Sequence, residues 1–469
     1  MGLGSVGREV ANALGMEWAD RIAEPVGSLP WTSRLPVATL ATDSVAVASL
    51  AMNDARNARG STTPSTVRVD RARVAASFGS ERVLRVDDQP PAVWAPLSGF
   101  WRSADGWVRT HANYTHHERA LRALLGLSAE AGKDAVADAI LAAAAVDWED
   151  LAASSGAVVG AVRGADVWSV HPQAHAVAAQ PLVEVTRFGD APPRRWRDGS
   201  APLSGIRVLD MTRVLAGPVA ARDLALAGAQ VLRVDSPHLE ETGWIHLDTG
   251  QGKRSTRLDL DDTIDRRAFE SLLATADVLL TGYRPGALSR FGLDAGDLAH
   301  RHPGLVTGSV SAWGTHGPWA GRRGFDSIVQ AVTGIAMLES PDGVTPGALP
   351  VQALDHSAGH FLAAAVTIGL IEQRKQGGSV DVRIALARIA HALLHSPDSR
   401  TLTSTTDAVP LPSRHRELSG RPQSLTYAPP VLAFDGAPDD YPVVGGAWGV
   451  DAPAWSISGQ VRPNSREAP

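Results

Sequence analysis

Residues 206–234 read IRVLDMTRVLAGPVAARDLALAGAQVLRV, and this stretch decides the fold. It contains a short apolar run at 206–210, an alanine-rich segment of helix length at 217–228, and a second apolar run at 230–234. Short runs rich in Val and Leu, separated by helices, are typical of strands that are buried on both faces of a parallel sheet. The alternation continues through residues 202–395, so we predict an α/β domain there.

Further motifs follow this pattern in order along the chain. They lie at 202–218, 228–234, 252–255, 276–280 and 283–288. Together they resemble CoA-transferase family III, the group of formyl-CoA transferase, carnitine CoA-transferase and α-methylacyl-CoA racemase. The resemblance implies a Rossmann-like open parallel sheet as the large domain and a smaller α+β domain beside it.

Two segments of the chain share one layout. Asp43 and Asp355 each lead into an alanine-rich helix, which is followed by a predicted strand, at 66–70 and at 379–383, and then by another helix. The distance from the aspartate to the second residue of the strand is 24 residues in the first segment and 25 in the second. Because both order and spacing agree, we interpret the two segments as an internal repeat.

The small domain of the family has matching motifs in this chain, at 100–108, 148–151, 156–162 and 168–173. In the family this domain follows the large domain, whereas here it precedes it. The simplest reconstruction is a tandem duplication trimmed at both ends. We therefore predict an N-terminal leader (1–35), a helix–strand half-repeat of the large domain (36–80), the small domain (81–191), a linker (192–201), the CoA-binding large domain (202–395) and a proline-rich tail (396–469) that includes a short hairpin at 431–434 and 443–446.

Composition narrows the functional classes. A chain of 469 residues holds two or three domains, and its formal net charge of −6 gives no field that would recruit nucleic acid or an anionic membrane. Zero cysteines excludes disulfides, thiolate metal sites and a cysteine nucleophile. We find no apolar run near the roughly 20 residues that span a bilayer and no signal-peptide layout, so we expect a cytoplasmic protein.

The family resemblance implies a covalent nucleophile. Members use an aspartate that follows a Gly-Phe-Asp-type segment, here 324–326, and Asp355 is the matching residue. It would attack an acyl-CoA thioester, giving an aspartyl anhydride and then an aspartyl-CoA thioester. We expect its carboxylate to be ionised at a helix N-terminus, where spare N–H groups also serve an oxyanion. The structural alternative is an ordinary helix cap, and we interpret Asp43 as one.

The resemblance also implies positions that bind CoA. Arginine suits this task because its planar fork matches phosphate and stacks on adenine. The matching residues are Arg213, Leu215, Ala216, Tyr283, Arg290 and Arg323.

Two other motifs are interpreted as structural. Residues 2–7 spell GxGxxG, but only Met1 precedes them, so no strand delivers these glycines to a dinucleotide. His356 and His360 lie four apart and share a helix face, yet no third ligand is marked nearby. We predict no metal site.

Two departures from the family bear on function. Phe325 stands where the racemase branch has a histidine, which disfavours α-proton exchange. Transferases of the family also tend to have a glycine-rich loop that closes over the catalytic aspartate, and here only Gly445 and Gly446 are a candidate for it.

We predict a CoA-transferase that moves CoA from an acyl-CoA to a free carboxylic acid. The alternatives are a 2-methylacyl-CoA racemase and a non-catalytic CoA-binding subunit. The resemblance implies an interlocked homodimer, with a hetero-oligomer of related chains as the alternative.

Overall fold

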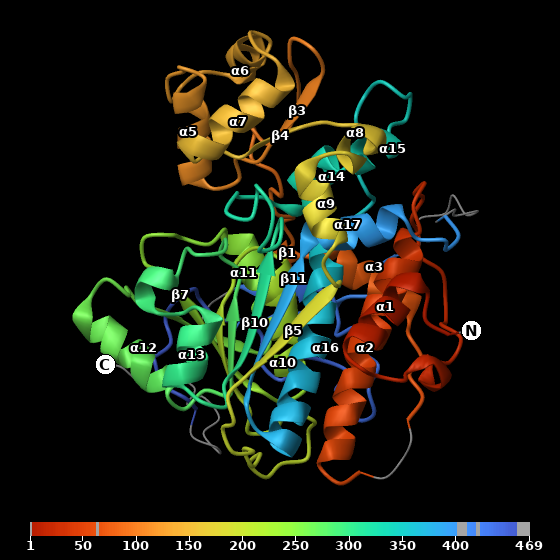
Figure 1. Cartoon of the computed structure of the whole chain (residues 1–469), viewed down its shortest axis with the longest axis vertical. Helices are drawn as coiled ribbons and strands as arrows, with labels where there is room; N and C mark the ends of the chain where they lie inside the picture. Colours follow the sequence, from red (N-terminus) through yellow and green to blue (C-terminus); the bar gives the residue numbers. More distant parts are fainter. Residues whose placement is uncertain (1, 62–64, 401–409, 419–422, 457–469) are drawn as a thin grey trace.

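The computed structural model describes residues 2–61, 65–400, 410–418 and 423–456. Its centre is a seven-stranded sheet in the order β5-β11-β10-β9-β6-β7-β8, in which β5 is antiparallel and the other six strands are parallel (Figure 1). The prediction of a Rossmann-like α/β fold is confirmed. The strands are β5 (Val183–Phe188), β6 (Arg207–Met211), β7 (Gln230–Asp235), β8 (Lys253–Arg257), β9 (Val278–Thr281), β10 (Val306–Ser311) and β11 (Ser379–Ala385).

The strand order reverses between β6 and β9. From β6 the chain adds β7 and β8 on one side of the sheet, and from β9 it adds β10 and β11 on the other side. In open α/β sheets this switch point opens a crevice at the carboxyl ends of the strands, where ligands bind. The helices of this part are α10 (Ala216–Leu226), α11 (Gly243–Thr249), α12 (Thr263–Leu273), α13 (Ala295–Arg301), α14 (Asp326–Val332), α15 (Ile335–Leu338), α16 (Ala353–Gln376) and α17 (Leu386–Leu394), with a 3₁₀ turn, η2 (Ser289–Phe291).

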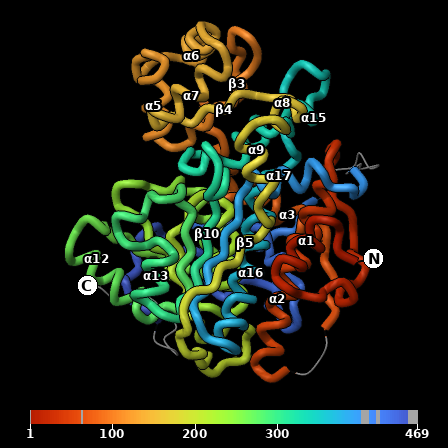
Figure 2. Tube along the Cα trace, viewed as in Figure 1, coloured from red at the N-terminus to blue at the C-terminus, as the bar shows by residue number. Residues whose placement is uncertain are grey.

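Helix α16 is the core helix. It packs on β10 and β11, against α10, and against α2 (Val37–Ala58), which comes from the N-terminal part of the chain (Figure 2). By length and composition α16 alone, among the described helices, could cross a membrane, but its apolar window is wholly buried inside the protein. A helix that is apolar on every side is stable in water only when it is covered on every side.

A small lobe stands above the sheet (Figure 1). Its three-stranded sheet and three helices enclose a separate apolar core. Its elements are β2 (Gly99–Arg102), β3 (Trp107–Thr110), β4 (Val159–Ala161), α5 (Thr115–Leu124), α6 (Lys133–Ile140) and α7 (Ala145–Ser155).

The rest of the predicted small-domain range lies on the large body. Helices α8 (Ala165–Ser169) and α9 (Pro172–Ala178) follow the lobe, and β5 joins the large sheet. Gln173 on α9 donates to the carbonyl oxygens of Trp313 and His316, both at 2.9 Å. The chain therefore leaves the lobe well before residue 191.

The glycine motif opens helix α1 (Ser5–Ala13). The Asp43 carboxylate accepts hydrogen bonds from Gly4 N at 3.0 Å and Gly7 N at 3.1 Å. Asp43 thus occupies the positive end of α1 and does not cap its own helix, which begins at Val37. The two copies of the predicted repeat differ in structure. In the first copy, the strand predicted at 66–70 is reduced to two isolated bridges, and α3 (Arg71–Phe78) and α4 (Ser80–Val83) follow it.

The described part of the tail adds a hairpin, β12 (Arg414–Glu417) with β13 (Ser424–Tyr427), which pairs with β1 (Arg85–Val86). The hairpin predicted at 431–434 and 443–446 is wrong. The first segment packs alongside α2, where Ala433 N donates to Ser49 Oγ at 2.9 Å. In the second segment, Val443 O accepts from the N–H of Gly252, the residue directly before β8. A 3₁₀ turn, η1 (Ala19–Arg21), completes the described elements.

Gly359 is where α16 meets α10, and we expect Gly359→Ala to destabilise the fold by about 1–3 kcal/mol. A Cβ there would lie 2.6 Å from Ala216 O, a backbone atom that cannot move aside. Gly369→Ala is the matched control, since the nearest atoms to its Cβ would be valine side-chain carbons at 3.2 Å or more. Chemical denaturation of both variants checks this, and equal stabilities would contradict it.

Candidate active site

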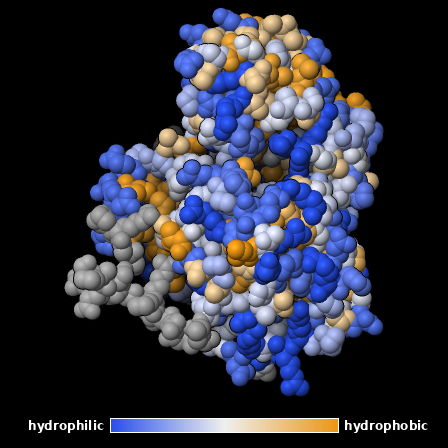
Figure 3. Space-filling model, turned by 90° about the vertical axis from the view of Figure 1, so that its left-hand side faces the viewer, coloured by the Kyte–Doolittle hydropathy of each residue, from blue (hydrophilic) through white to orange (hydrophobic). Residues whose placement is uncertain are grey.

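A cavity of about 290 Å³ lies between the lobe and the large body, and Asp355 lines it. Figure 3 shows a recess at the junction of the two parts. The large body contributes residues from the loop after β6, from α11 and α14, and from the segment before α16. The lobe and the stretch before it contribute Val93, Trp94, Phe100, Arg109, His111 and Asn113.

Asp355 is the third residue of α16, and its side chain is 7% exposed. The N-cap of the helix is Gln352, and Asp355 makes no capping hydrogen bond. Its carboxyl group has no hydrogen-bond partner among the described residues. The cap alternative is therefore not what the structure shows; the carboxyl group instead lines the cavity.

The expectation that Asp355 is ionised through the helix N-terminus is wrong. Burial raises the pKa of Asp355 well above its usual value, and the neighbouring Asp326 raises it further. The N–H group of Asp355 donates to Asp326 Oδ2 at 3.0 Å, and that of His356 donates to Gln352 O. These amides are thus engaged within the protein and are not spare for an oxyanion.

The carboxyl group of Asp326, unlike that of Asp355, is held by hydrogen bonds. Its Oδ1 accepts a hydrogen bond from Gln330 Nε2, while Gln330 Oε1 accepts one from Leu349 N at 2.9 Å. Burial raises the pKa of Asp326 to about 6, and the hydrogen bonds oppose that rise. In the sequence the Gly-Phe-Asp segment marks only the position of Asp355. The second carboxyl group beside the predicted nucleophile, that of Asp326, is therefore not predicted from the sequence.

The loop after β6 is held by a buried carboxylate. Val214 has φ of +68°, a conformation that β-branched residues rarely adopt. Its N–H donates to Glu241 Oε2 at 3.1 Å, which also accepts from Arg233 at 2.8 Å. The other oxygen of Glu241 accepts from the hydroxyl of Tyr114 in the lobe. One carboxylate therefore ties the strained loop to the lobe.

The predicted CoA residues of this loop fall at different depths. Leu215 lines the cavity with Asp355, and Ala216 is the buried first residue of α10. The Arg213 guanidinium lies 4.8 Å above the Tyr114 ring and donates to Glu240 O at 2.7 Å. Arg323, buried in part, has a lowered pKa because of its desolvation and the nearby Arg284.

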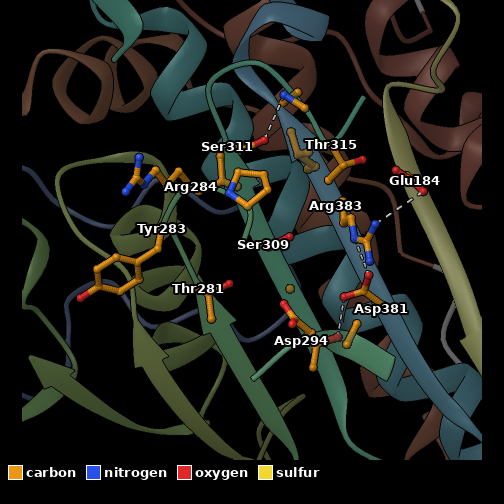
Figure 4. A pocket seen from close by; sticks show the side chains of 18 of the residues that line it. Glu184, Thr281, Tyr283, Arg284, Asp294, Ser309, Ser311, Thr315, Asp381 and Arg383 are labelled. Atoms are coloured by element: carbon orange, nitrogen blue, oxygen red, sulfur yellow. Dashed lines mark hydrogen bonds and ion pairs between the residues drawn. The ribbon is translucent and has the colours of Figure 1, made fainter. Parts of the chain in front are cut away.

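Tyr283 and Arg290 do not line the cavity of Asp355. Arg290 pairs with Asp261 at 2.7 Å on the surface, where its side chain is 64% exposed. Tyr283 lines a second cavity, of about 250 Å³, on β9, β10 and β11. Figure 4 shows the Asp381–Arg383 pair of that cavity and the Tyr283 ring pointing away from it.

The lobe supplies site residues that the sequence interpretation missed. The His111 ring stacks on Phe325 with centroids 3.6 Å apart and planes 5° apart. Its desolvation and the charge of Arg109 lower the pKa of His111 to about 3, so the imidazole is neutral. Arg109 and His111 are two residues apart at the end of a strand and so share a face. That spacing was the available signal.

The remaining sequence candidates are structural. His360 Nδ1 lies 2.6 Å from Asp223 Oδ2, and His356 stacks on Phe78 at 4.9 Å; both histidines are in the core. Within the described ranges no three or more His, Cys, Asp or Glu side chains gather as metal ligands. Gly445 packs on Gly250 beside α11, so this pair of glycines does not line the Asp355 cavity.

Asp355→Asn is expected to stabilise the fold, and more so at pH 8 than at pH 5. The raised folded-state pKa means that the unfolded chain loses this proton first, so stability falls as pH rises above the unfolded value of about 4 and through the folded pKa. Asparagine removes that loss. Thermal unfolding at both pH values is the measurement. Asp261→Asn, on the surface, is the control, and a gain that does not depend on pH would contradict the assignment.

Comparisons with known proteins agree with these motifs. The sequence model of CoA-transferase family III matches residues 203–427. A probable fatty acyl-CoA transferase of Mycobacterium tuberculosis is 34% identical over 206 residues, which cover 41% of this chain and 52% of that protein. The succinate–glutarate CoA-transferase of Agrobacterium fabrum is 31% identical over 237 residues, covering 46% of this chain and 59% of that protein.

The matched region is only part of these proteins: the chain spans about half the length of the curated relatives it matches. A solved CAIB/BAIF family structure from Brucella suis is 27% identical over 47% of this chain and 64% of its own, with a TM-score of 0.39. The resemblance read from the sequence is supported by the comparisons: residues 203–427 of this chain match the sequence model of CoA-transferase family III.

Proposed function

We propose that this protein transfers CoA from an acyl-CoA to a free carboxylic acid, with Asp355 as the covalent nucleophile. The observation that carries the proposal is the Asp355 carboxyl group, which is buried, free of hydrogen bonds to described residues, and directed at a cavity between two lobes. Named relatives of the family III region are CoA-transferases, among them the succinyl-CoA:glutarate enzyme of Homo sapiens.

The reaction proceeds in four exchanges. The Asp355 carboxylate attacks the thioester carbon; a C–O bond forms, the C–S bond breaks, and CoA thiolate leaves an aspartyl anhydride. The thiolate attacks the aspartyl carbonyl, which releases the first acid and leaves an aspartyl-CoA thioester. The acceptor carboxylate attacks that thioester, and the returning thiolate then takes the new acyl group and frees Asp355. Covalent catalysis thus divides one difficult exchange into easier steps.

The buried setting of Asp355 suits this chemistry. A carboxylate with a raised pKa is a better nucleophile once ionised, and a closed cavity protects an anhydride from water. Residues of the lobe and of the segment 348–352 line the cavity, which assigns closure to them and not to Gly445 and Gly446. The lobe and the large body that line the cavity come from one chain, so an interlocked homodimer is not needed to complete it. The homodimer stays a prediction.

Intact-protein mass after mixing with acetyl-, propionyl- or succinyl-CoA tests the nucleophile. We expect a CoA-sized, hydroxylamine-labile adduct on the peptide that contains Asp355. Asp355→Asn should abolish it, whereas the surface variant Asp261→Asn should form it normally. CoA binding without an adduct from any donor would refute the transferase proposal and favour a non-catalytic CoA-binding subunit.

A second candidate function is α-proton exchange on an acyl-CoA, as in the racemase branch. Phe325 disfavours this function in the sequence analysis, because its side chain offers no imidazole. His111, however, stacks on Phe325 within the cavity, and its Nδ1 is buried without a partner among the described residues. In this reaction His111 would take the α-proton, and the protonated Asp355 would return one to the opposite face.

Incubation of a 2-methylacyl-CoA in D₂O tests this second function. It predicts deuterium at the α-carbon at a rate that His111→Gln lowers roughly 100-fold or more, as is usual for loss of a general base. His116→Gln, at an exposed neighbouring position, is the matched control. An α-carbon that stays free of deuterium in the unmodified protein would eliminate the racemase alternative.

A further inference from the structure

Arg109 on β3 is a buried cation without an anion. Its side chain lies in the small lobe, 9% exposed, with the guanidinium carbon 4.8 Å from the Trp94 ring centroid and 5.0 Å from that of Phe100. Among the described residues no carboxylate pairs with it, and its buried Nε has no hydrogen-bond partner. Burial lowers the pKa of Arg109 to about 10, so it stays charged at neutral pH.

Two other buried arginines, Arg163 and Arg233, are paired with carboxylates. Arg163 donates to both oxygens of Glu149, at 2.6 and 2.8 Å. Arg233 donates to both oxygens of Asp235 and to Glu241. An unpaired buried charge costs several kcal/mol, which aromatic faces offset only in part. The missing anion of Arg109 is therefore to be sought in the cavity that this side chain lines.

Arg109 and Asp355 stand at opposite ends of a series of contacts along the cavity. Asp355 bonds through its N–H to Asp326, which directly follows Phe325. Phe325 stacks on His111, whose ring centroid lies 6.3 Å from that of Trp94, the ring beneath Arg109. Beside Asp355, the Asp326 carboxylate disfavours an anion at neutral pH, whereas the unpaired guanidinium of Arg109 attracts one.

We propose that Arg109 binds a second carboxylate, carried at the far end of the acyl group, so that the substrates of this protein are dicarboxylic acids and their mono-CoA thioesters. The inference rests on the proposed transferase function. The reacting carbonyl lies at Asp355, and the planar guanidinium takes the distal carboxylate through two parallel hydrogen bonds. The cavity, about 290 Å³, fits a short carbon chain between these ends.

The test is the substrate profile of Arg109→Met and Arg109→Lys with succinyl-CoA and propionyl-CoA. Propionyl-CoA has no distal carboxylate. For Arg109→Met we expect kcat/KM for succinyl-CoA to fall roughly 100-fold or more, as when one partner of a buried charge pair is removed, and that for propionyl-CoA to change little. Lysine should restore part of the loss. Arg102→Met, on neighbouring β2 with its guanidinium over Trp107, is the matched control.

Two results would overturn the proposal. One is an unmodified protein that uses propionyl-CoA as well as succinyl-CoA. The other is an Arg109→Met variant that loses both thioesters alike or binds CoA itself more weakly, which would make Arg109 a contact to the reacting carboxylate or to a phosphate.

Binding keeps this test apart from the transferase proposal. In calorimetry with Asp355→Ala, which cannot form the adduct, succinyl-CoA should bind more tightly than propionyl-CoA. Adding Arg109→Met should remove that difference. If the unmodified protein shows no turnover, the transferase proposal fails, and the calorimetric difference still decides whether Arg109 holds a carboxylate. Equal affinities for the two thioesters would reject that role.

Discussion

The structure depends on the burial of α16. This helix lies against β10 and β11 on one side and α10 on another, and its remaining apolar surface is covered by α2. Exposing that surface would forfeit about 25 cal/mol for each Å² of apolar area. The N-terminal segment is thus part of the large body, although some 300 residues separate α2 from α16. The same packing fixes the N-terminus of α16, and with it Asp355, in the lining of the cavity.

The beginning of α16 holds two carboxyl groups for one positive helix end. Asp326 takes the backbone N–H of Asp355 and is further held by Gln330, so its charge uses the stabilisation that a helix N-terminus offers. Asp355 receives none of these bonds, and it also experiences the charge of Asp326. Two acids 29 residues apart in sequence but adjacent in the fold therefore differ in pKa, which is how a protein assigns different roles to like groups.

Sequence reasoning recovered what short-range patterns encode. The apolar runs at 206–210 and 230–234 became β6 and β7, and the landmark before Asp355 located it at the start of a helix. It missed relations between distant segments. Nothing local to residues 183–188 shows that β5 pairs antiparallel with β11, and the strand predicted at 66–70 had no partner long enough to make it one. Arg109 and His111 escaped notice because only the docking of the lobe turns a strand end toward Asp355.

The docking of the lobe and the shape of the loop after β6 are linked through one buried carboxylate. Glu241 accepts from Tyr114 of the lobe with one oxygen and from Val214 with the other. Val214 holds a backbone conformation that costs of order 1–3 kcal/mol and persists only while its surroundings enforce it. If the lobe moved away, Glu241 would lose a buried partner and its grip on the loop would weaken. The lobe that brings Arg109 and His111 to the cavity thereby also helps to keep Leu215 in the lining of the same cavity.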